Sequence, residues 1–201
     1  MNKGVYIALE GMDGVGKSTV MPYISDYLKS IGRDVVEVRE PGSTPLGERI
    51  RELLKSDCPM TDKTTLLLMM SAHCELVHDV VLPALKEGKV VLSDRCYISA
   101  LAYQGKGAGV AYKTLGLDTL PDYLYVLKLP LDTAIKRRGN DDRFELKDYD
   151  YQLRVWKFHD KLDRSYISRK YEGRVKGIDA SKSAPYTGIQ IVEHLQSVGL
   201  N

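Results

Sequence analysis

A glycine-rich segment near the start of the chain has the residue types and spacing of a phosphate-binding loop. The stretch ALEGMDGVGKSTVM, residues 8–21, matches the pattern GxxxxGKS/T through Gly11, Gly16, Lys17 and Ser18. Backbone N–H groups of such a loop, placed at the positive end of a helix, surround phosphate oxygens. Lys17 would then reach the β- and γ-phosphates, and the Ser18 hydroxyl would ligate Mg²⁺. The pattern predicts a nucleoside triphosphate site formed by Gly11, Met12, Asp13, Gly14, Val15, Gly16, Lys17, Ser18 and Thr19.

A second pair of candidate catalytic residues ends the apolar stretch KVVLSDR, residues 89–95. The stretch is typical of a buried strand that ends at Asp94 and Arg95, and ligands bind at the carboxyl ends of strands in an open α/β sheet. Asp94 could hold a water on Mg²⁺. Arg95 could bridge the donor and acceptor phosphates and offset the charge that develops during transfer. The alternative is an exposed ion pair after a strand, which the nearby phosphate loop makes the weaker interpretation.

The elements that must position these residues alternate between strands and helices. Short apolar runs predict strands, and longer segments with helical periodicity lie between them, a pattern typical of a parallel sheet covered on both faces. The predicted strands span residues 5–10, 35–38, 90–93, 123–129 and 174–178. The predicted helices span residues 17–31, 46–56, 62–87, 131–138, 148–171 and 185–198. No linker or repeat divides the sequence, so residues 1–201 are predicted to form one three-layer α/β domain.

Composition argues against several classes of function. The formal net charge is +2, with 29 basic and 27 acidic residues, so the overall charge favours neither nucleic acid nor an acidic membrane as a partner. Three cysteines without metal-ligand spacing predict neither a disulfide framework nor a zinc site, and they favour a reduced, cytoplasmic setting. The first residues lack the apolar core of a signal peptide or of a membrane span. The guanine-specifying NKxD string of regulatory GTPases is absent.

Seven segments, taken in order, resemble the thymidylate kinase family, whose members transfer the γ-phosphoryl group of ATP to dTMP. They are EGMDGVGKST, REPGST, GERIRELL, PALKEGKVVLSDR, SALAYQG, DRFE and IDAS, and together they extend over nearly the whole chain. The resemblance implies a P-loop kinase fold with a five-stranded parallel sheet, a homodimer, and Mg²⁺ bound with ATP as the phosphoryl donor. The implied acceptor is a deoxynucleoside 5′-monophosphate, either dTMP or a related 5-substituted deoxyuridylate.

The same resemblance implies four residues that bind the acceptor. Asp13 would accept a hydrogen bond from the 3′-hydroxyl of the sugar, although an aspartate in a turn can instead bond its own backbone. Glu40 would organise the phosphate and magnesium region. Arg51 would bind the 5′-phosphate, although it also lies on a charged helix where i, i+4 ion pairs are ordinary. Tyr103 would lie near C2′ and crowd out a ribose 2′-hydroxyl, so the enzyme would prefer deoxynucleotides.

A lid over ATP is also implied, at about residues 137–147. Members of the family place an arginine either in the phosphate loop or in a mobile segment, and the loop residue after Asp13 is Gly14. The segment KRRGNDDR therefore supplies the candidates Arg137, Arg138 and Arg143. Its glycine and polar residues suit a hinged lid that excludes water from ATP, and they are equally acceptable in a solvated loop.

The expected base pocket departs from the family pattern at three positions. Met69 replaces an aromatic residue that stacks on thymine, His73 replaces an arginine that donates to its O4 atom, and Ala100 replaces a hydrogen-bonding side chain. Gln104 remains to bind the pyrimidine edge, and Ser99 is a further substrate-binding candidate. A flexible methionine and a small alanine could admit a base that is larger at C5, or several bases. The alternatives are that Met69 belongs to the core and that His73 is hydrogen-bonded without contacting a ligand.

The long helix predicted for residues 148–171 carries an apolar stripe. Residues at steps of three or four are predicted to face the core. They are Tyr151, Val155, Phe158, Leu162 and Tyr166. Trp156 and His159 lie off this stripe and are assigned no chemistry.

Together these features predict a nucleoside monophosphate kinase with small-molecule substrates, in which Lys17, Asp94 and Arg95 are catalytic. One alternative is a deoxynucleoside monophosphate kinase of broader or different base specificity. Another is an ATP-binding regulatory protein without an acceptor. ADP release that depends on a nucleoside monophosphate distinguishes the enzyme from the regulatory protein.

Overall fold

Five parallel strands form one sheet within the residues that the computed structural model describes, which are 3–117, 119–138, 144–165 and 174–201. The strands are β1 (Val5–Glu10), β2 (Val35–Arg39), β3 (Val90–Asp94), β4 (Tyr123–Lys128) and β5 (Val175–Asp179). Their order in the sheet is β2-β3-β1-β4-β5, and every pairing is parallel. Each strand begins and ends within one residue of its predicted bounds, so the predicted fold class is confirmed.

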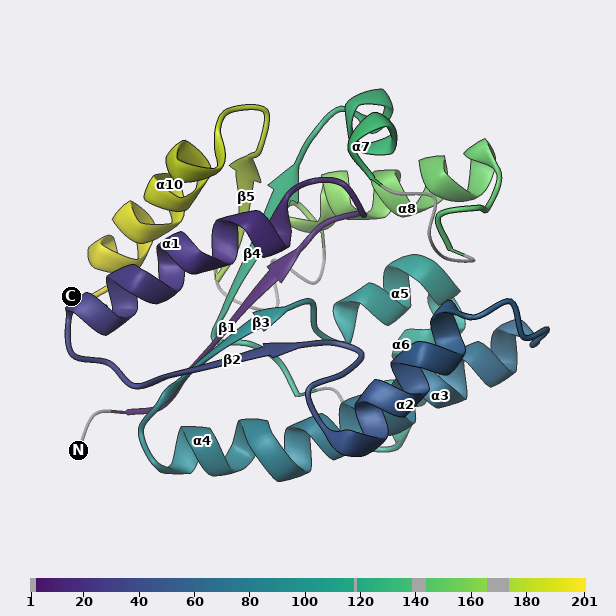
Figure 1. Cartoon of the computed structure of the whole chain (residues 1–201), viewed down its shortest axis with the longest axis horizontal. Coiled ribbons are helices and arrows are strands. Elements are labelled where there is room, and N and C mark those ends of the chain that lie inside the picture. The colour runs from purple at the N-terminus through teal and green to yellow at the C-terminus, as the bar shows by residue number, and fades with distance from the viewer. Residues whose placement is uncertain (1–2, 118, 139–143, 166–173) are drawn as a thin grey trace.

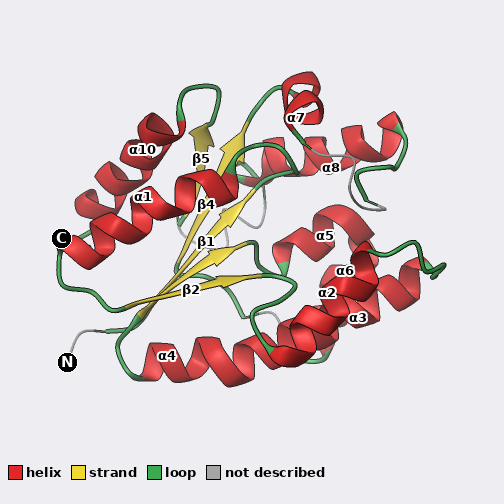
Figure 2. Cartoon of the chain, viewed as in Figure 1, coloured by secondary structure: helices red, strands yellow, loops and turns green. Residues whose placement is uncertain are grey.

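Helices connect the strands and cover both faces of the sheet (Figure 1). They are α1 (Lys17–Ser30), α2 (Pro45–Lys55), α3 (Asp62–Leu76), the π-helical turn η1 (Val77–Val81), α4 (Leu82–Lys86), α5 (Ile98–Gln104), α6 (Lys106–Thr114), α7 (Leu131–Arg137), α8 (Tyr149–Leu162) and α10 (Ala184–Ser197). Figure 2 shows the strands as a central layer, with α1 and α10 on one side and α3 and α4 on the other.

Two helices, α5 and α6, were not predicted from the sequence. Gly105 separates them, and α6 contains Gly107 and Gly109, which disfavour a helix in local terms. Ala108 and Tyr112 of α6 are fully buried, so tertiary packing outweighs the local preference.

The other predicted helices form with bounds within one residue of the prediction, except the helix predicted for residues 148–171. It corresponds to α8, which ends at Leu162 and is followed by a turn. Residues 166–171, including the predicted stripe residue Tyr166, lie outside the described part of the chain.

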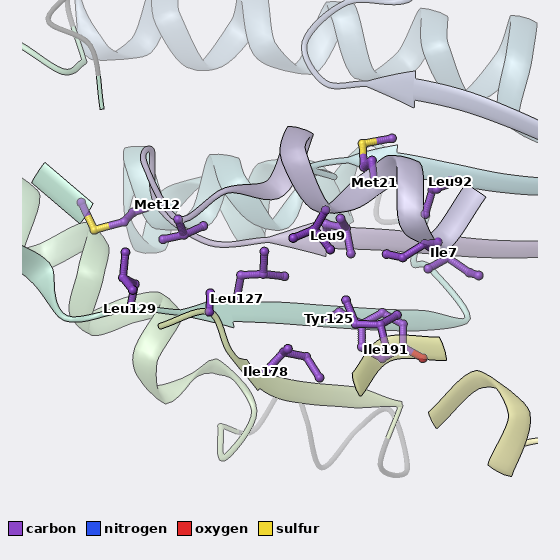
Figure 3. Close-up of a cluster of buried hydrophobic side chains, with 14 of the residues drawn as sticks. Ile7, Leu9, Met12, Met21, Leu92, Tyr125, Leu127, Leu129, Ile178 and Ile191 are labelled. Atoms are coloured by element: carbon purple, nitrogen blue, oxygen red, sulfur yellow. The ribbon is translucent and has the colours of Figure 1, made fainter. Parts of the chain in front are cut away.

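The two faces of β1 belong to two separate hydrophobic clusters. Because successive side chains of a strand point to opposite faces, Ile7 and Leu9 pack with residues of α1 and α10, whereas Tyr6 and Ala8 pack with residues of α3 and α4. Figure 3 shows the first cluster, in which Ile191 of α10 lies near the strands. The central strand is therefore covered on both sides, as expected for a parallel sheet.

The run Asp62–Lys86 is a helix long and apolar enough to cross a membrane by length and composition alone. It comprises α3, η1 and α4. Met70, Leu76 and Val81 from this run are buried in the cluster that covers one face of the sheet. Packing within the domain thus accounts for part of its apolar character.

The parallel register brings the chemistry-bearing residues to one edge of the sheet. Asp94 at the end of β3 lies opposite Leu9 of β1 and Arg39 of β2. The phosphate loop leaves β1 after Glu10, and Arg95 follows Asp94 directly. The loop and the Asp94–Arg95 pair, far apart in the sequence, therefore meet at the carboxyl edge, where ligands bind in such sheets.

Two isoleucines of α10 provide a matched test of the core. Ile191 is fully buried, whereas Ile189 on the same helix is 52% exposed. Ile191→Ala leaves a cavity in a close-packed layer and is expected to lower the free energy of unfolding by about 2–5 kcal/mol, and Ile189→Ala by about 0.5 kcal/mol or less. Urea denaturation followed by circular dichroism measures both. Equal losses in the two variants would contradict this packing of α10.

Candidate active site

The phosphate loop forms one wall of a polar cavity at the carboxyl edge of the sheet. Residues 13–19 of the predicted site line this cavity, whereas Gly11 and Met12 are not part of its lining. Lys17 begins α1 and is 6% exposed. Its Nζ atom donates hydrogen bonds to the carbonyl oxygens of Gly11 (3.0 Å) and Met12 (3.1 Å). The lysine charge is thus held at the loop, next to the space that phosphates would fill.

Helix α7 lies directly against the phosphate loop. Gly14 has a φ of 83°, and a Cβ atom there would lie 2.2 Å from the carbonyl oxygen of Ala134, so this position requires glycine. Arg137 and Arg138, at the end of α7, consequently line the polar cavity. The Nε and Nη1 atoms of Arg138 are buried without a hydrogen-bond partner among the described residues. Arg143, the third predicted lid arginine, lies outside the described residues, as do residues 139–142.

Ser18 and Asp94, the two predicted magnesium ligands, contact each other in this cavity. The Ser18 hydroxyl donates to Asp94 Oδ2 at 2.9 Å. Asp94 Oδ1 is buried and has no hydrogen-bond partner among the residues described. One hydroxyl and one carboxylate with spare acceptor capacity fit Mg²⁺, which prefers oxygen ligands and binds through few protein groups when phosphates and water supply the rest. The described residues contain no cluster of three or more His, Cys, Asp or Glu that could hold a metal alone.

Arg95 connects the phosphate loop to α5. Its φ of 76° is a left-handed conformation, which costs a non-glycine residue on the order of 1–3 kcal/mol and recurs at active sites. Its Nη1 donates to the Gly11 carbonyl (2.9 Å) and to the Ser99 hydroxyl (3.0 Å), and its Nη2 donates to Asp13 Oδ1. Because the side chain is only 13% exposed, its positive charge has a fixed position at the cavity wall.

The carboxylate of Asp13 is directed toward Arg95 and Tyr103. Its Oδ1 accepts from Arg95, and its Oδ2 accepts from the Tyr103 hydroxyl at 2.8 Å. Burial alone would raise the pKa of Asp13, but the charges of Arg95 and Lys17 hold that pKa well below its usual range, so the carboxyl is ionised at neutral pH. Within the described residues no hydrogen bond joins this carboxylate to its own loop backbone, which argues against the turn-forming interpretation.

A second, more apolar cavity adjoins the polar one. The two cavities share Asp13, Glu40, Arg51 and Arg95. Arg51 is held there by a hydrogen bond from its Nη1 to the Pro41 carbonyl (3.0 Å). Because Arg51 and Arg95 among the shared residues are positively charged, a ligand that spans both cavities would place its phosphate group beside these two arginines and its apolar part in the second cavity. Further lining residues of the second cavity include Met69, Ser99, Ala100, Tyr103, Tyr112 and Phe144.

A buried carboxylate that the sequence did not reveal supports Arg95 from behind. Glu10, fully buried at the end of β1, accepts a hydrogen bond from the Ser99 hydroxyl (2.8 Å) and is hydrogen-bonded to His159 Nε2 (3.2 Å). Its Oε2 atom lies 4.0 Å from Arg95 Nη1. Burial alone would raise the pKa of Glu10, but His159 and Arg95 lower it to about 2. Arg95 is therefore flanked by two negative charges.

Two sequence signals could have revealed this network. Glu10 is a charged residue at the end of an otherwise apolar strand, at the edge where ligands bind. His159 follows the fully buried Val155 by four residues, so it shares the buried face of α8 and is itself 3% exposed. The interpretation of His159 as a residue without chemistry is therefore revised: it belongs to the hydrogen-bond network behind the site.

His73 lies behind the second cavity and is not part of its lining. The residue is fully buried, with Nδ1 2.9 Å from Glu40 Oε2 and Nε2 2.9 Å from the Leu117 carbonyl oxygen. Both partners accept hydrogen bonds when Glu40 is ionised, so the ring satisfies both only as an imidazolium. Burial would lower the pKa of His73, but Glu40 and the Leu117 carbonyl raise it. This placement departs from the predicted base contact and agrees with the alternative of a hydrogen-bonded histidine.

The other residues predicted for the base pocket divide into two groups. Met69, Ser99 and Ala100 line the second cavity, whereas Gln104, at the end of α5, is not among its lining residues. The Ser99 hydroxyl already bonds Glu10 and Arg95. Of the four residues predicted to contact the base, Met69 and Ala100 thus line the second cavity, whereas His73 and Gln104 do not.

Comparisons of the sequence and of the structure with known proteins agree with one another. The family model described as thymidylate kinase matches residues 9–187 of the chain. A thymidylate kinase of Acinetobacter baylyi is 34% identical over 206 residues, covering 96% of this chain and 100% of the relative. A thymidylate kinase of Vesicomyosocius okutanii is 38% identical over 212 residues, covering 98% and 100%. The crystal structure of thymidylate kinase from Ehrlichia chaffeensis superposes with a TM-score of 0.74 at 26% identity, covering 96% of this chain and 100% of that one.

The Glu40–His73 pair is expected to make stability depend on pH. Because the pKa of His73 is higher in the folded protein than its unfolded value of about 6.5, the contribution of the pair is complete below about pH 6.5 and is lost as the pH rises through the folded pKa. The stability advantage of the wild type over His73→Gln should therefore shrink as the pH rises above about 6.5. Urea denaturation at each pH measures it.

His194 provides a control, because its pKa is shifted in the opposite direction and its effect on stability should change with pH in the opposite sense. Burial and the nearby Lys176 lower the pKa of His194, so the wild type should gain stability relative to His194→Gln as the pH rises toward about 6.5. A pH-independent difference between the wild type and His73→Gln would show that His73 carries no extra proton in the folded state.

Proposed function

Because the chain belongs to the thymidylate kinase family, we propose that it transfers the γ-phosphoryl group of ATP to the 5′-phosphate of dTMP, giving dTDP and ADP. The observation that carries the proposal is the pair of adjoining cavities that share Asp13, Glu40, Arg51 and Arg95. One cavity is lined by the phosphate loop and the other is largely apolar. Two nucleotides that enter from opposite sides would therefore bring their phosphates together at the two shared arginines, Arg51 and Arg95.

On the donor side, the loop and Lys17 hold the triphosphate. The hydrogen bonds from Lys17 Nζ to the Gly11 and Met12 carbonyls keep the ammonium group at the loop, from which it can reach the β- and γ-phosphates. Arg95, fixed between the loop and α5, offsets negative charge on the transferring group. Catalysis then consists of positioning and charge neutralisation, without a covalent intermediate.

Ser18 and Asp94 are the residues that would hold Mg²⁺. The ion, bound together with ATP, supplies neutralisation of the phosphate oxygens. Asp94 Oδ1, which has no hydrogen-bond partner in the described part of the chain, supports this assignment. Arg137 and Arg138, with Arg143, would complete the donor side as a lid that excludes water.

On the acceptor side, Arg51 and Arg95 would bind the 5′-phosphate. Glu40 would organise the phosphate and magnesium region. Asp13 would accept a hydrogen bond from the 3′-hydroxyl, since a carboxylate offers about four acceptor positions and only two are used. Tyr103, bonded to Asp13, would lie beside C2′ and exclude a ribose. A homodimer and a cytoplasmic location complete the proposal.

ADP release that depends on dTMP is the direct test. With ATP and Mg²⁺, the wild type should release ADP much faster when dTMP is added. Lys17→Ala or Arg95→Ala should each lower kcat by about 10²-fold or more, because each substitution removes a positively charged side chain that would lie beside the transferring phosphoryl group. A coupled spectrophotometric assay measures the rates. Lys161→Ala, at an exposed position outside both cavities, is the control and should leave kcat unchanged.

A panel of acceptors decides between the alternatives in the same assay. Strict preference for dTMP over dUMP, 5-substituted dUMP, dCMP, dGMP and dAMP would exclude an enlarged or permissive base pocket. Preference for another base would support a kinase of different specificity. ADP release that none of these nucleotides stimulates would favour a regulatory ATP-binding protein and contradict the proposed function.

The role of Asp13 is tested by removing its proposed partner. The wild type should lose about 10-fold or more in kcat/KM when dTMP is replaced by its 3′-deoxy analogue, because a hydrogen bond to a charged group is lost. In Asp13→Ala the same replacement should cost less than about 3-fold, since the bond is already absent. An equal loss in both proteins would mean that Asp13 does not contact the sugar.

A further inference from the structure

The wall of the second cavity contains a tyrosine to which neither the sequence motifs nor the proposed mechanism gives a role. Tyr112 lies on α6, lines the cavity and is fully buried. Its hydroxyl has no hydrogen-bond partner among the residues that the structure describes. A buried hydroxyl without a partner is unfavourable, and native proteins rarely keep one without a reason.

The ring of Tyr112 is held in place by two other aromatic rings. The His73 ring packs edge-on against it with centroids 5.4 Å apart, and the Tyr97 ring lies 5.3 Å away. Burial, together with the negative charge of Glu40, raises the pKa of Tyr112, so the phenol keeps its proton at neutral pH. The hydroxyl therefore has a proton to donate and a lone pair to accept with.

Three other polar groups of this wall already have hydrogen-bond partners. The Tyr103 hydroxyl donates to Asp13, the Ser99 hydroxyl donates to Glu10, and Arg51 donates to the Pro41 carbonyl. The neighbours expected around a base are apolar, namely Met69 and Ala100, and Met69 is flexible enough to yield to a ring. Tyr112 is thus a buried hydroxyl of the described wall that has no partner and is left to meet the polar edge of a base.

We propose that the Tyr112 hydroxyl hydrogen-bonds the polar edge of the acceptor's pyrimidine at C4 and so contributes to base selection. This inference rests on the proposed function and deepens it. In dTMP or dUMP the phenol donates to the C4 oxygen, and in dCMP it accepts from the C4 amino group, because a hydroxyl serves both roles. His73, whose ring nitrogens bond Glu40 and Leu117, orients the phenol from behind.

The test compares Tyr112→Phe with the wild type. The variant keeps the ring and loses only the hydroxyl. It should lower kcat/KM for dTMP and for dUMP by the same factor, about 3- to 30-fold, mainly through KM. Its melting temperature should stay the same or rise, because an unpartnered buried hydroxyl is removed. Tyr6→Phe, at a buried tyrosine of β1 outside both cavities, is the matched control and should change kcat/KM less than about 2-fold.

A nucleotide without the C4 substituent allows a double-perturbation comparison, in which the hydroxyl of Tyr112 and its proposed partner on the base are removed separately and together. The wild type should use the 2-pyrimidinone analogue of dTMP at least about 3-fold less efficiently than dTMP, whereas Tyr112→Phe should discriminate less between the two. A Tyr112→Phe variant with unchanged kcat/KM, or with unchanged discrimination, would overturn the inference and leave the proposed function intact. A wild type that neither binds dTMP in calorimetry nor phosphorylates it would overturn both.

Discussion

The buried guanidinium of Arg95 is the interaction on which the rest of the site depends. It lies between two carboxylates, Asp13 in the phosphate loop and Glu10 at the end of β1, and it also bonds Ser99 on α5. Buried charges persist only when they are paired. The loop, the central strand and α5 are therefore held in one arrangement, and the left-handed backbone at Arg95 is maintained because these contacts over-determine it.

The same pairing explains an acidic residue in a loop built for phosphate. The Asp13 carboxylate is neutralised by Arg95 and bonded by Tyr103, both of which line the second cavity. Its charge is thus directed to the second cavity, the proposed acceptor side, while the loop amides and Lys17 remain for the proposed donor. The phosphate loop can thus serve two proposed binding regions, because its backbone and the side chain of Asp13 point in different directions.

The base region is organised by a different pair. The buried Glu40–His73 contact keeps His73 out of the lining of the second cavity, which includes Met69, Ala100 and Tyr112. A buried pair that is fully bonded internally stiffens its surroundings and offers little to a ligand. Under the proposed function, selection of the base would then come from the shape of this wall and from the groups within it that have spare hydrogen-bonding capacity.

The sequence by itself determined the strands, most helices, the phosphate loop and the Asp94–Arg95 pair, because each depends on local periodicity or spacing and on the rule that ligands bind at the carboxyl edge of a parallel sheet. It did not determine α5, nor α6, whose Gly107 and Gly109 disfavour helix until tertiary burial stabilises it. Nor did it place Glu10 with His159, which lie 149 residues apart, or turn His73 toward Glu40. Only the tertiary structure decided these contacts, because the partner that satisfies a buried polar group is chosen by proximity in the fold and not by distance along the chain.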